Sequence, residues 1–561
     1  MKAVLRSLLP EGRAARLLSA SAGLGVLVGL VLSAFEWFTV TFLLHEVVEL
    51  PLAVQAIAPL VGLAIATLLL RTVGGGISNS TSDEYINQFH ARNPDLPERQ
   101  LLPRLFAGAA TIGSGGALGL EGPAIYTGSV FGLSLHQRLD KWLGKDGARL
   151  LLTAGAAAGV SAIFQTPATG VLFALEAPYR DDLAHRALLP ALIASAASFL
   201  TYVSMPFIKQ EPFLGPIAPG DIGAAELIGA VAIGVGAGFG GRIYAWLVRR
   251  AKKISKAHHP VQLVLVGGVL LGALAVASDT IFGEPLTLGP GFNVVEWLID
   301  PTRSLQLIFI LFFFRAAATM VTVGSGGTGG LFIPLAIQGV LLGQIVSSAL
   351  DAAGLVSNTD RIWPILGLAA FIAAGYRTPI AAVMFVAEST RGAAVVPALI
   401  ASAVSQLVAG RTSVSIGQRV ERLGHLEERF TLPLAAALTT DVLTVPPDAT
   451  LSEFVWIHAL GRRVRIVPVV DGSTYLGLCS VDACTSIDRD LWETMTVMDV
   501  IDTTMPTANA NWSLRDAVAA MGAGETDMLA VLDDSENFIG VVVEAEIVKL
   551  GEILEETGSP Q

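Results

Sequence analysis

The stretch Gly113-Ser-Gly-Gly-Ala-Leu-Gly-Leu-Glu121-Gly-Pro-Ala-Ile125 places five glycines and one carboxylate between long apolar segments. Glycine at this density lets backbone N–H groups approach a ligand closely, and Pro123 before an apolar run suits the first turn of a helix. Because a helix start offers unpaired amides and the positive end of the helix dipole, it can hold an anion without lysine or arginine. Glu121 stands at this predicted helix start, where its carboxylate can compete with an external anion. The alternative interpretation is a glycine-rich helix-packing segment with a structural glutamate.

A second copy of this pattern favours the functional interpretation. It reads Gly324-Ser-Gly-Gly-Thr-Gly-Gly-Leu-Phe332-Ile-Pro334 and lies 211 residues further along, so that Phe332 stands where the first copy has Glu121. Downstream, Thr166-Pro167 … Glu176 is echoed by Thr378-Pro379 … Glu388 at an offset of 212 residues. The repeat predicts two homologous halves, roughly 50–210 and 222–420. Membrane transporters are often built from such halves, with half-helix N-termini directed at an anionic substrate.

The composition excludes an ordinary soluble chain. Of the 561 residues, 52% are hydrophobic and only 15% are charged, and the mean hydropathy is +0.62, which indicates a polytopic membrane protein. The apolar stretches are unequal in length, and several are interrupted by glycine or proline, whereas one perpendicular span needs about 20 residues. We therefore predict an α-helical membrane domain over 1–430 with broken and tilted helices.

Basic residues predict the orientation. Lys2, Arg6, Arg13 and Arg16 precede the first apolar run, and a second basic segment covers 249–256. The positive-inside rule places both in the cytoplasm, so we expect both termini on the cytoplasmic side of a bacterial-type inner or plasma membrane. Both cysteines fall in the last quarter of the chain, which suggests no disulfide framework.

Three further candidate sites lie outside the repeat. The cluster Val73-Gly-Gly-Gly-Ile-Ser-Asn-Ser-Thr-Ser-Asp83 follows a predicted span and is either a third backbone cradle or a polar loop. His45 and Glu46 suit a membrane interface better than a metal site, because other ligand types at metal-binding spacing are missing nearby. Glu36 lies deeper in an apolar run, and we assign it no role.

The chain changes from mainly apolar to strongly acidic near residue 430. The segment 431–561 carries 21 acidic and 6 basic residues, a net charge of −15, against −12 for the whole chain. Such an acidic tail argues against nucleic acid as a partner. The tail also repeats, since Asp448-Ala-Thr-Leu451 … Val469-Val-Asp471 is matched by Asn511-Trp-Ser-Leu514 … Val531-Leu-Asp533. We predict a cytoplasmic α/β domain of two units, about 437–495 and 498–555, each with the order strand, helix, strand, turn, strand.

The paired units resemble a tandem of cystathionine-β-synthase-type (CBS) domains, which in many proteins bind adenine nucleotides. In that family an acidic residue after the final glycine commonly holds the ribose. Glu546 occupies roughly that place in the second unit, whereas Ala483 occupies it in the first. Nucleotide binding through Glu546 is therefore weakly indicated, and regulation without a nucleotide, or simple dimerisation, is at least as well supported.

Taken together, the chain resembles the CLC family of chloride channels and chloride/proton exchangers. That family's G-R/K-E-G-P motif appears as Gly119-Leu-Glu121-Gly-Pro123, its G-x-F-x-P motif as Gly330-Leu-Phe332-Ile-Pro334, and its G-S-G-I-P motif, weakly, as Gly74-Gly-Gly-Ile-Ser78. The resemblance implies a homodimer of inverted-repeat subunits, each with its own anion pathway, in which Glu121 is the gating glutamate. It implies anion contacts at Gly75, Gly76, Ile77, Leu120, Glu121, Gly122, Leu331, Phe332 and Val414.

The sequence departs from the family pattern at four positions. Gly75 stands where the family usually has a serine that contacts the central anion, and Val414 stands where it uses a tyrosine. We therefore expect the site to rest on backbone amides, notably those of Leu331 and Phe332. Leu120 removes a positive charge beside Glu121. Ala177 stands where exchangers commonly carry an inward-facing glutamate, which weakens the expected proton coupling.

These features lead to one functional prediction with open alternatives. We predict chloride or other small-anion transport gated by a protonatable glutamate, channel-like or weakly proton-coupled, with protons acting at Glu121. A chloride/proton antiporter with an unusual inner proton route is the alternative, and a fluoride exporter fits less well. An intramembrane enzyme is not supported, because no metal or nucleophile motif is present. A cation transporter is disfavoured because helix starts present donors. No cofactor is expected besides the weakly indicated nucleotide. We expect Glu176 and Glu388 to share a structural role, pairing with Arg180 or Arg391.

Overall fold

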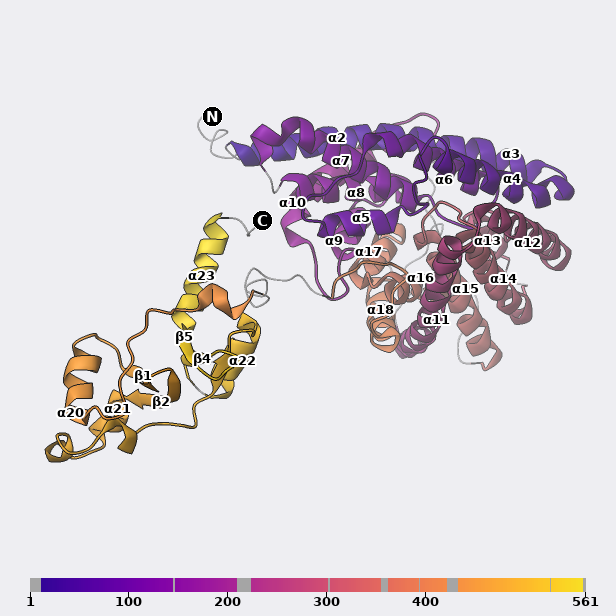
Figure 1. Ribbon diagram of the computed structural model, residues 1–561. Helices are drawn as coiled ribbons and strands as arrows, with labels where there is room; N and C mark the ends of the chain where they lie inside the picture. Colours follow the sequence, from indigo (N-terminus) through magenta and orange to yellow (C-terminus); the bar gives the residue numbers. More distant parts are fainter. Residues whose placement is uncertain are drawn as a thin grey trace, which may run out of the picture. The chain divides into compact units, whose positions relative to one another are not determined.

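The computed structural model describes residues 12–144, 147–208, 223–300, 303–354, 362–392, 394–420, 432–524 and 526–557. The chain divides into two compact units, Met1–Glu421 and Arg422–Gln561. The first is helical and the second combines helices with strands (Figure 1), in agreement with the predicted fold class.

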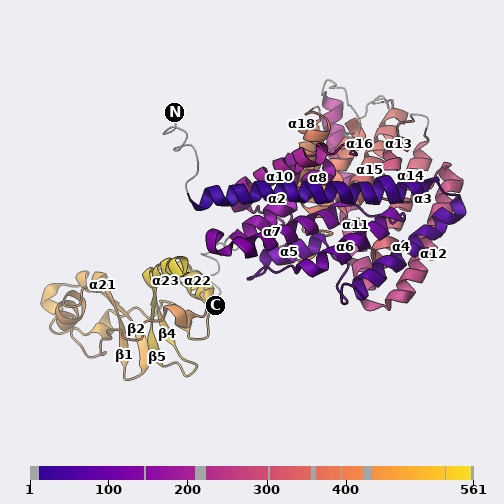
Figure 2. The ribbon, with the colours of Figure 1, turned by 90° about the horizontal axis from the view of Figure 1, so that it is seen from above.

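The first half of the helical unit begins with a long apolar helix, α2. In Figure 2, α2 crosses one face of the unit and passes α10 and α7, which it contacts. The elements of this half are α2 (Arg13–Glu36), the π-helical η1 (Trp37–Leu44), α3 (His45–Glu49), α4 (Leu52–Arg71), α5 (Ser82–His90), α6 (Leu101–Gly113), α7 (Glu121–Leu143), α8 (Gly147–Phe164), α9 (Pro167–Glu176) and α10 (Leu188–Val203).

The second half repeats this order. Its elements are α11 (Ala224–Ala257), α12 (Pro260–Phe282), α13 (Phe292–Trp297), α14 (Leu305–Gly324), α15 (Phe332–Ala352), α16 (Ile362–Tyr376), α17 (Pro379–Ser389) and α18 (Val395–Ala409). Within the described residues, eight helices are long and apolar enough to cross a membrane. α9, α16, α17 and α18 are apolar but shorter, as expected for broken helices.

Reciprocal hydrogen bonds relate the two halves. Ala117 N donates to Thr322 Oγ1 (3.1 Å), and Thr328 N donates to Thr111 Oγ1 (3.2 Å). Adding 211 to the number of the first-half residue and subtracting 211 from that of the second-half residue turns each bond into the other. A pseudo-two-fold axis therefore passes between the two glycine-rich stretches. The repeat seen in the sequence is therefore a spatial repeat.

The second unit contains two small sheets, one for each predicted repeat. β1 (Ile466–Asp471) pairs antiparallel with β2 (Thr474–Ser480), and β4 (Met528–Leu532) lies between β3 (Thr507–Asn509), parallel, and β5 (Phe538–Val543), antiparallel. The helical elements are η4 (Leu434–Ala437), α20 (Leu451–Glu453), η5 (Phe454–Leu460), α21 (Val481–Thr485), η6 (Arg489–Leu491), η7 (Val497–Asp499), α22 (Leu514–Ala523) and α23 (Glu544–Thr557).

The two sheets meet edge to edge. Phe538 N donates to Ser473 O (2.8 Å), and the rings of Tyr475 and Phe538 stack with centroids 6.1 Å apart. Each repeat keeps its own apolar core, one around Phe454 and Val469 and the other around Leu514 and Val531. The tail is thus a pair of joined α/β units.

Candidate anion site

Two glycine-rich loops bring the starts of α7 and α15 together. Gly119 and Gly330 form a two-residue antiparallel bridge, in which each N–H donates to the other's carbonyl at 3.0 and 2.7 Å. A Cβ atom at either position would collide with the Glu121 carboxylate. Glycine is needed at both positions because the backbone must lie directly against this side chain.

Glu121 is the first residue of α7 and is fully buried. Its Oε1 accepts a 2.5 Å hydrogen bond from Phe332 N, the first amide of α15. Its Oε2 has no hydrogen-bond partner among the described residues. A carboxylate of the first half therefore occupies the helix start of the second half, which is a place where an anion can bind.

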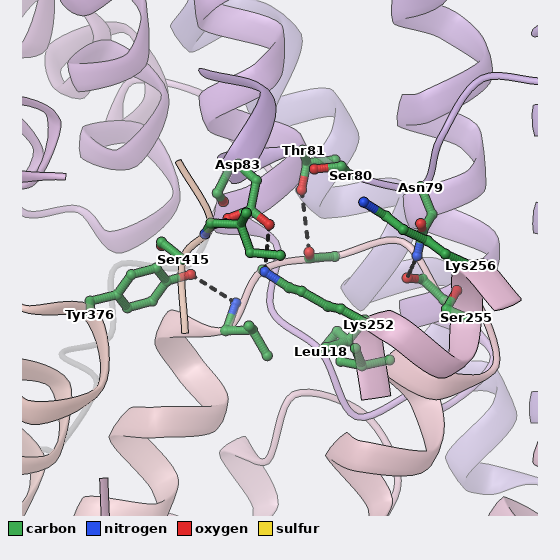
Figure 3. A pocket seen from close by; sticks show the side chains of 17 residues that line it. Asn79, Ser80, Thr81, Asp83, Leu118, Lys252, Ser255, Lys256, Tyr376 and Ser415 are labelled. Atoms are coloured by element: carbon green, nitrogen blue, oxygen red, sulfur yellow. Dashed lines mark hydrogen bonds and ion pairs between the residues drawn. The ribbon is translucent and has the colours of Figure 1, made fainter. Parts of the chain in front are cut away.

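The neighbouring amide is occupied in a similar way. Leu331 N donates to the hydroxyl oxygen of Tyr376 at 3.2 Å (Figure 3). Both amides that the sequence predicted as anion donors are thus present side by side, and each is covered by a side-chain oxygen. Leu120 and Gly122 flank Glu121 in the same buried junction, where Gly122 packs against Thr81 and Gly329.

Aromatic rings surround Phe332. The rings of Phe164, Phe173, Tyr376 and Phe385 lie with centroids 4.6, 5.4, 6.4 and 5.4 Å from that of Phe332. Phe164 and Tyr376 are equivalent under the 212-residue offset, so the second half places a hydroxyl where the first half has only a phenyl ring. The ring cluster packs the start of α15 between the two halves.

A cavity of about 70 Å³ lies beside this junction (Figure 3). Gly330 separates the two, because it lines the cavity and also contacts the Glu121 carboxylate. The segment before α5 forms another wall, where Asn79 Nδ2 donates to Gly327 O at 3.0 Å and Thr81 Oγ1 donates to Gly329 O at 3.3 Å. The remaining polar lining residues are Ser80, Ser82, Asp83, Lys252, Ser255, Lys256, Tyr376 and Ser415.

Gly75, Gly76 and Ile77, which the resemblance implied as anion contacts, do not line this cavity. Gly75 and Gly76 are exposed, with φ of +73° and +85°, and Gly76 N donates back to Leu70 O at 3.0 Å. These glycines end α4, as left-handed residues commonly do. The hydroxyl-bearing residues at the start of the next helix, α5, are Ser80, Thr81 and Ser82, several positions later.

Val414, the other implied anion contact, lies beside the cavity. Its side chain is fully buried and does not line the cavity, although its backbone borders it: Val414 N donates to Gly375 O at 2.8 Å, and its carbonyl accepts from Lys252 Nζ at 3.0 Å. A tyrosine hydroxyl does reach the cavity, from Tyr376. The sequence analysis missed Tyr376, although a tyrosine immediately before Arg377-Thr378-Pro379, within an apolar run, was a usable signal.

Backbone amides, and no arginine within the described residues, are the partners of Glu176 and Glu388. Glu176 accepts hydrogen bonds from Ile380 N (3.0 Å) and Ala381 N (2.7 Å) at the start of α17. Glu388 accepts from Ala168 N (2.9 Å) and Thr169 N (2.8 Å) at the start of α9. The shared structural role was a sound expectation, but the predicted partners Arg180 and Arg391 were wrong.

The remaining candidates lie apart from the cavity. Glu36 ends α2 beside the Tyr202 hydroxyl of α10, and His45 pairs with Glu49 at an exposed end of α3. Ala177 is buried, and its carbonyl accepts from Gln418 Nε2 at 2.9 Å. In the second unit, Glu546 lies in the first turn of α23, half-exposed and within 3.5 Å of Lys549.

The first unit is thus a membrane protein of two joined halves that meet at opposed helix starts. Its sequence matches the family profile described as Voltage gated chloride channel over residues 61–410. The CBS domain profile matches residues 435–486 and 497–552. The chain therefore belongs to the voltage-gated chloride channel family, known as CLC, is a multi-pass integral membrane protein, and carries two C-terminal CBS domains.

Curated relatives come from several bacteria. A putative chloride channel protein ClcB-like from Ralstonia nicotianae is 25% identical over 374 residues, which cover 64% of this chain and 83% of that protein. H(+)/Cl(−) exchange transporters ClcA from Klebsiella pneumoniae and Citrobacter koseri are each 27% identical, over 52% of this chain and 62% of theirs. The match thus spans under two thirds of these exchangers' length.

Solved structures share the fold. A slow cyanobacterial Cl−/H+ antiporter superposes with a TM-score of 0.63 at 20% identity, covering 70% of this chain and 94% of that one. A CLC-type fluoride/proton antiporter gives 0.61 at 22% identity, covering 72% and 98%. A eukaryotic CLC transporter gives 0.59 at 16% identity and covers 95% of this chain and 98% of its own, so its match extends into the CBS region.

Proposed function

We propose that this chain transports chloride or another small anion, that residues 1–430 form the pathway, and that Glu121 is its gate. The observation that carries the proposal is the hydrogen bond from Phe332 N to Glu121 Oε1. An anion that binds the start of α15 must displace this carboxylate, since both require the same amide. A carboxylate that loses its charge on protonation releases the amide more readily, because a charge-assisted hydrogen bond is about twice as strong as a neutral one.

The rest of the site supports an anion and not a cation. The groups directed at the junction are the amides of Leu331 and Phe332 and the hydroxyl of Tyr376. Lys252 and Lys256 place two positive charges at the cavity against the one negative charge of Asp83. We assign Tyr376 the hydroxyl contact to the anion that the family resemblance had suggested for the Val414 position.

Chloride efflux from liposomes tests the gate. Glu121→Gln and Glu121→Ala are compared with the wild type and with Glu98→Gln, which alters an exposed glutamate. We choose about pH 7.5, where an ordinary glutamate is ionised, and about pH 4.5, where roughly half is protonated. We expect acid to activate the wild type and the control, whereas the two Glu121 variants should be active at both pH values. Identical pH profiles in all four proteins would refute the gate.

A chloride/proton antiporter is the second candidate. The exchangers named among the relatives favour it, whereas Ala177, in a position where exchangers commonly carry a glutamate, favours a channel-like or weakly coupled pathway. We propose the latter.

For assembly and orientation, we propose a homodimer with both termini in the cytoplasm, in a bacterial-type inner membrane. The basic segments before α2 and at the end of α11 support this orientation. Residues 431–561 are then a cytoplasmic domain.

A further inference from the structure

The cavity beside the Glu121 junction is bordered by a second carboxylate that is bound to a cationic partner. Lys252, near the end of α11, and Asp83, in the first turn of α5, both line it and contact each other (Figure 3). Lys252 Nζ lies 2.5 Å from Asp83 Oδ2 and 3.0 Å from Val414 O. The pair joins the two halves, because α5 belongs to the first and α11 to the second.

This ion pair is largely withdrawn from solvent. The exposed fractions of the Lys252 and Asp83 side chains are 20% and 13%. An ammonium at such a place requires a negative partner, since removing the partner leaves a poorly solvated charge. A halide that enters the cavity meets this requirement as well as a carboxylate does, and 70 Å³ is room enough for a small ion or a few water molecules.

Asp83 can leave Lys252 without losing all of its partners. Its other oxygen, Oδ1, accepts from Ile416 N at 3.0 Å. Asp83 also lies in the first turn of α5, where the helix dipole stabilises a negative charge. A modest side-chain rotation would therefore free the ammonium while the carboxylate keeps a favourable environment.

The arrangement parallels that of Glu121. In both cases a carboxylate from the first half occupies a donor of the second half, an amide in one case and an ammonium in the other. Glu121 contacts Gly330 from one side, and the cavity lined by Lys252 lies on the other side of Gly330 and Leu331. Lys256 lines the same cavity and adds charge that attracts anions.

We propose that the Lys252 ammonium forms a second binding site, or seat, for a small inorganic anion such as chloride, and that the Asp83 carboxylate occupies this seat when the anion is absent. The inference rests on the proposed anion transport and adds a binding step at the opposite side of Gly330 from Glu121. Asp83 then competes with the anion and sets the concentration at which the cavity fills.

Two variants of the full chain test this seat. Asp83→Asn removes the competing charge and keeps the side-chain shape, so the chloride concentration for half-maximal flux should fall at least about fivefold, the upper end of what the loss of an exposed ion pair causes. Lys252→Gln removes the seat and should raise that concentration by a similar factor. Lys253→Gln, which alters an exposed lysine next to Lys252 in the chain but outside the cavity, serves as the control.

Calorimetry with sodium chloride against sodium gluconate at constant ionic strength provides the second measurement. Asp83→Asn should bind chloride about fivefold more tightly than the wild type. If Lys252→Gln fails to fold, Asp83→Asn alone decides. If Asp83→Asn changed neither the chloride affinity nor the chloride concentration for half-maximal flux, the second site would be refuted. The proposed function would still hold in that case if Glu121→Gln increased chloride flux at about pH 7.5. Absence of chloride binding and flux in every variant would overturn both.

Discussion

Glu176 and Glu388 stand at the C-terminal ends of two short helices, and each accepts hydrogen bonds from the first amides of the other's helix. The pairs of amides, Ala168 with Thr169 and Ile380 with Ala381, are separated by the same 212 residues as the glutamates. Each carboxylate therefore caps the N-terminus of the other glutamate's helix, where it satisfies amides that have no partner within that helix.

Replacing either glutamate should mainly cost stability. A charged hydrogen bond of this kind contributes about 1.5–3 kcal/mol, and glutamine keeps only part of it. We expect Glu176→Gln and Glu388→Gln to lower the thermal unfolding temperature of the purified protein by similar amounts and to leave the ratio of proton to chloride flux unchanged. If Glu176→Gln alone altered that ratio, Glu176 would be a proton carrier and not a cap.

The Tyr376 hydroxyl should strengthen anion binding. Tyr376→Phe keeps the ring packing around Phe332 but removes the oxygen that now covers Leu331 N. Since a neutral hydrogen bond contributes about 0.5–1.5 kcal/mol, chloride binding measured by calorimetry should weaken roughly two- to tenfold.

The control for this variant is Tyr202→Phe, which alters a buried tyrosine of α10 beside Glu36 and away from the cavity. Equal binding by Tyr376→Phe and the wild type would show that the hydroxyl does not contact the anion. Equal losses in both variants would point to a general packing defect.

Proton coupling should be weak. A proton that crosses a low-dielectric protein needs titratable groups or ordered water along its way. Ala177 supplies no carboxyl group, and the nearby Glu176 already caps α17. We expect a chloride gradient to drive little uphill proton movement in sealed liposomes that show passive chloride flux.

Strong proton pumping in that assay would contradict the channel-like proposal and favour the antiporter. Glu36→Gln would then be the first variant to examine, because this carboxyl lies deep in an apolar helix and is not a helix cap.

The CBS units should support assembly more than nucleotide sensing. Glu546 lies in the expected first turn of α23, but Ala483 offers no matching carboxylate in the first unit. We expect ATP, ADP or AMP at millimolar concentration to leave the unfolding temperature of the full chain unchanged. A shift that Glu546→Ala abolishes would contradict this expectation, with Asp490→Ala, in an exposed part of the first CBS unit, as the control.

Features that repeat in the sequence were the ones that could be predicted from it. The equal spacing of the Glu121 and Phe332 stretches indicated opposed helix starts, and the 212-residue offset of Glu176 and Glu388 indicated a shared role. The partners of these two glutamates could not be predicted, because spacing along the chain does not tell which helix start lies opposite.

Features without a repeat were harder to place. Three consecutive glycines at 74–76 suggested a cradle, but glycine serves equally to end a helix with positive φ, and here it ends α4. Tyr376 and Lys252 reach the cavity from α16 and α11, far along the chain from Glu121. Only the folded structure brings such residues together.

The paired bonds that cross between the halves limit how this protein can move. Gly119 with Gly330, Thr111 with Thr328, and Glu176 with the start of α17 fasten the halves at the places that a rocking mechanism would have to pull apart. Opening them together would break several buried hydrogen bonds, each left unpaired at about 1–3 kcal/mol. Turnover on this scaffold should therefore depend on rotations of single side chains, and crosslinks that tie the two halves to each other should slow it little.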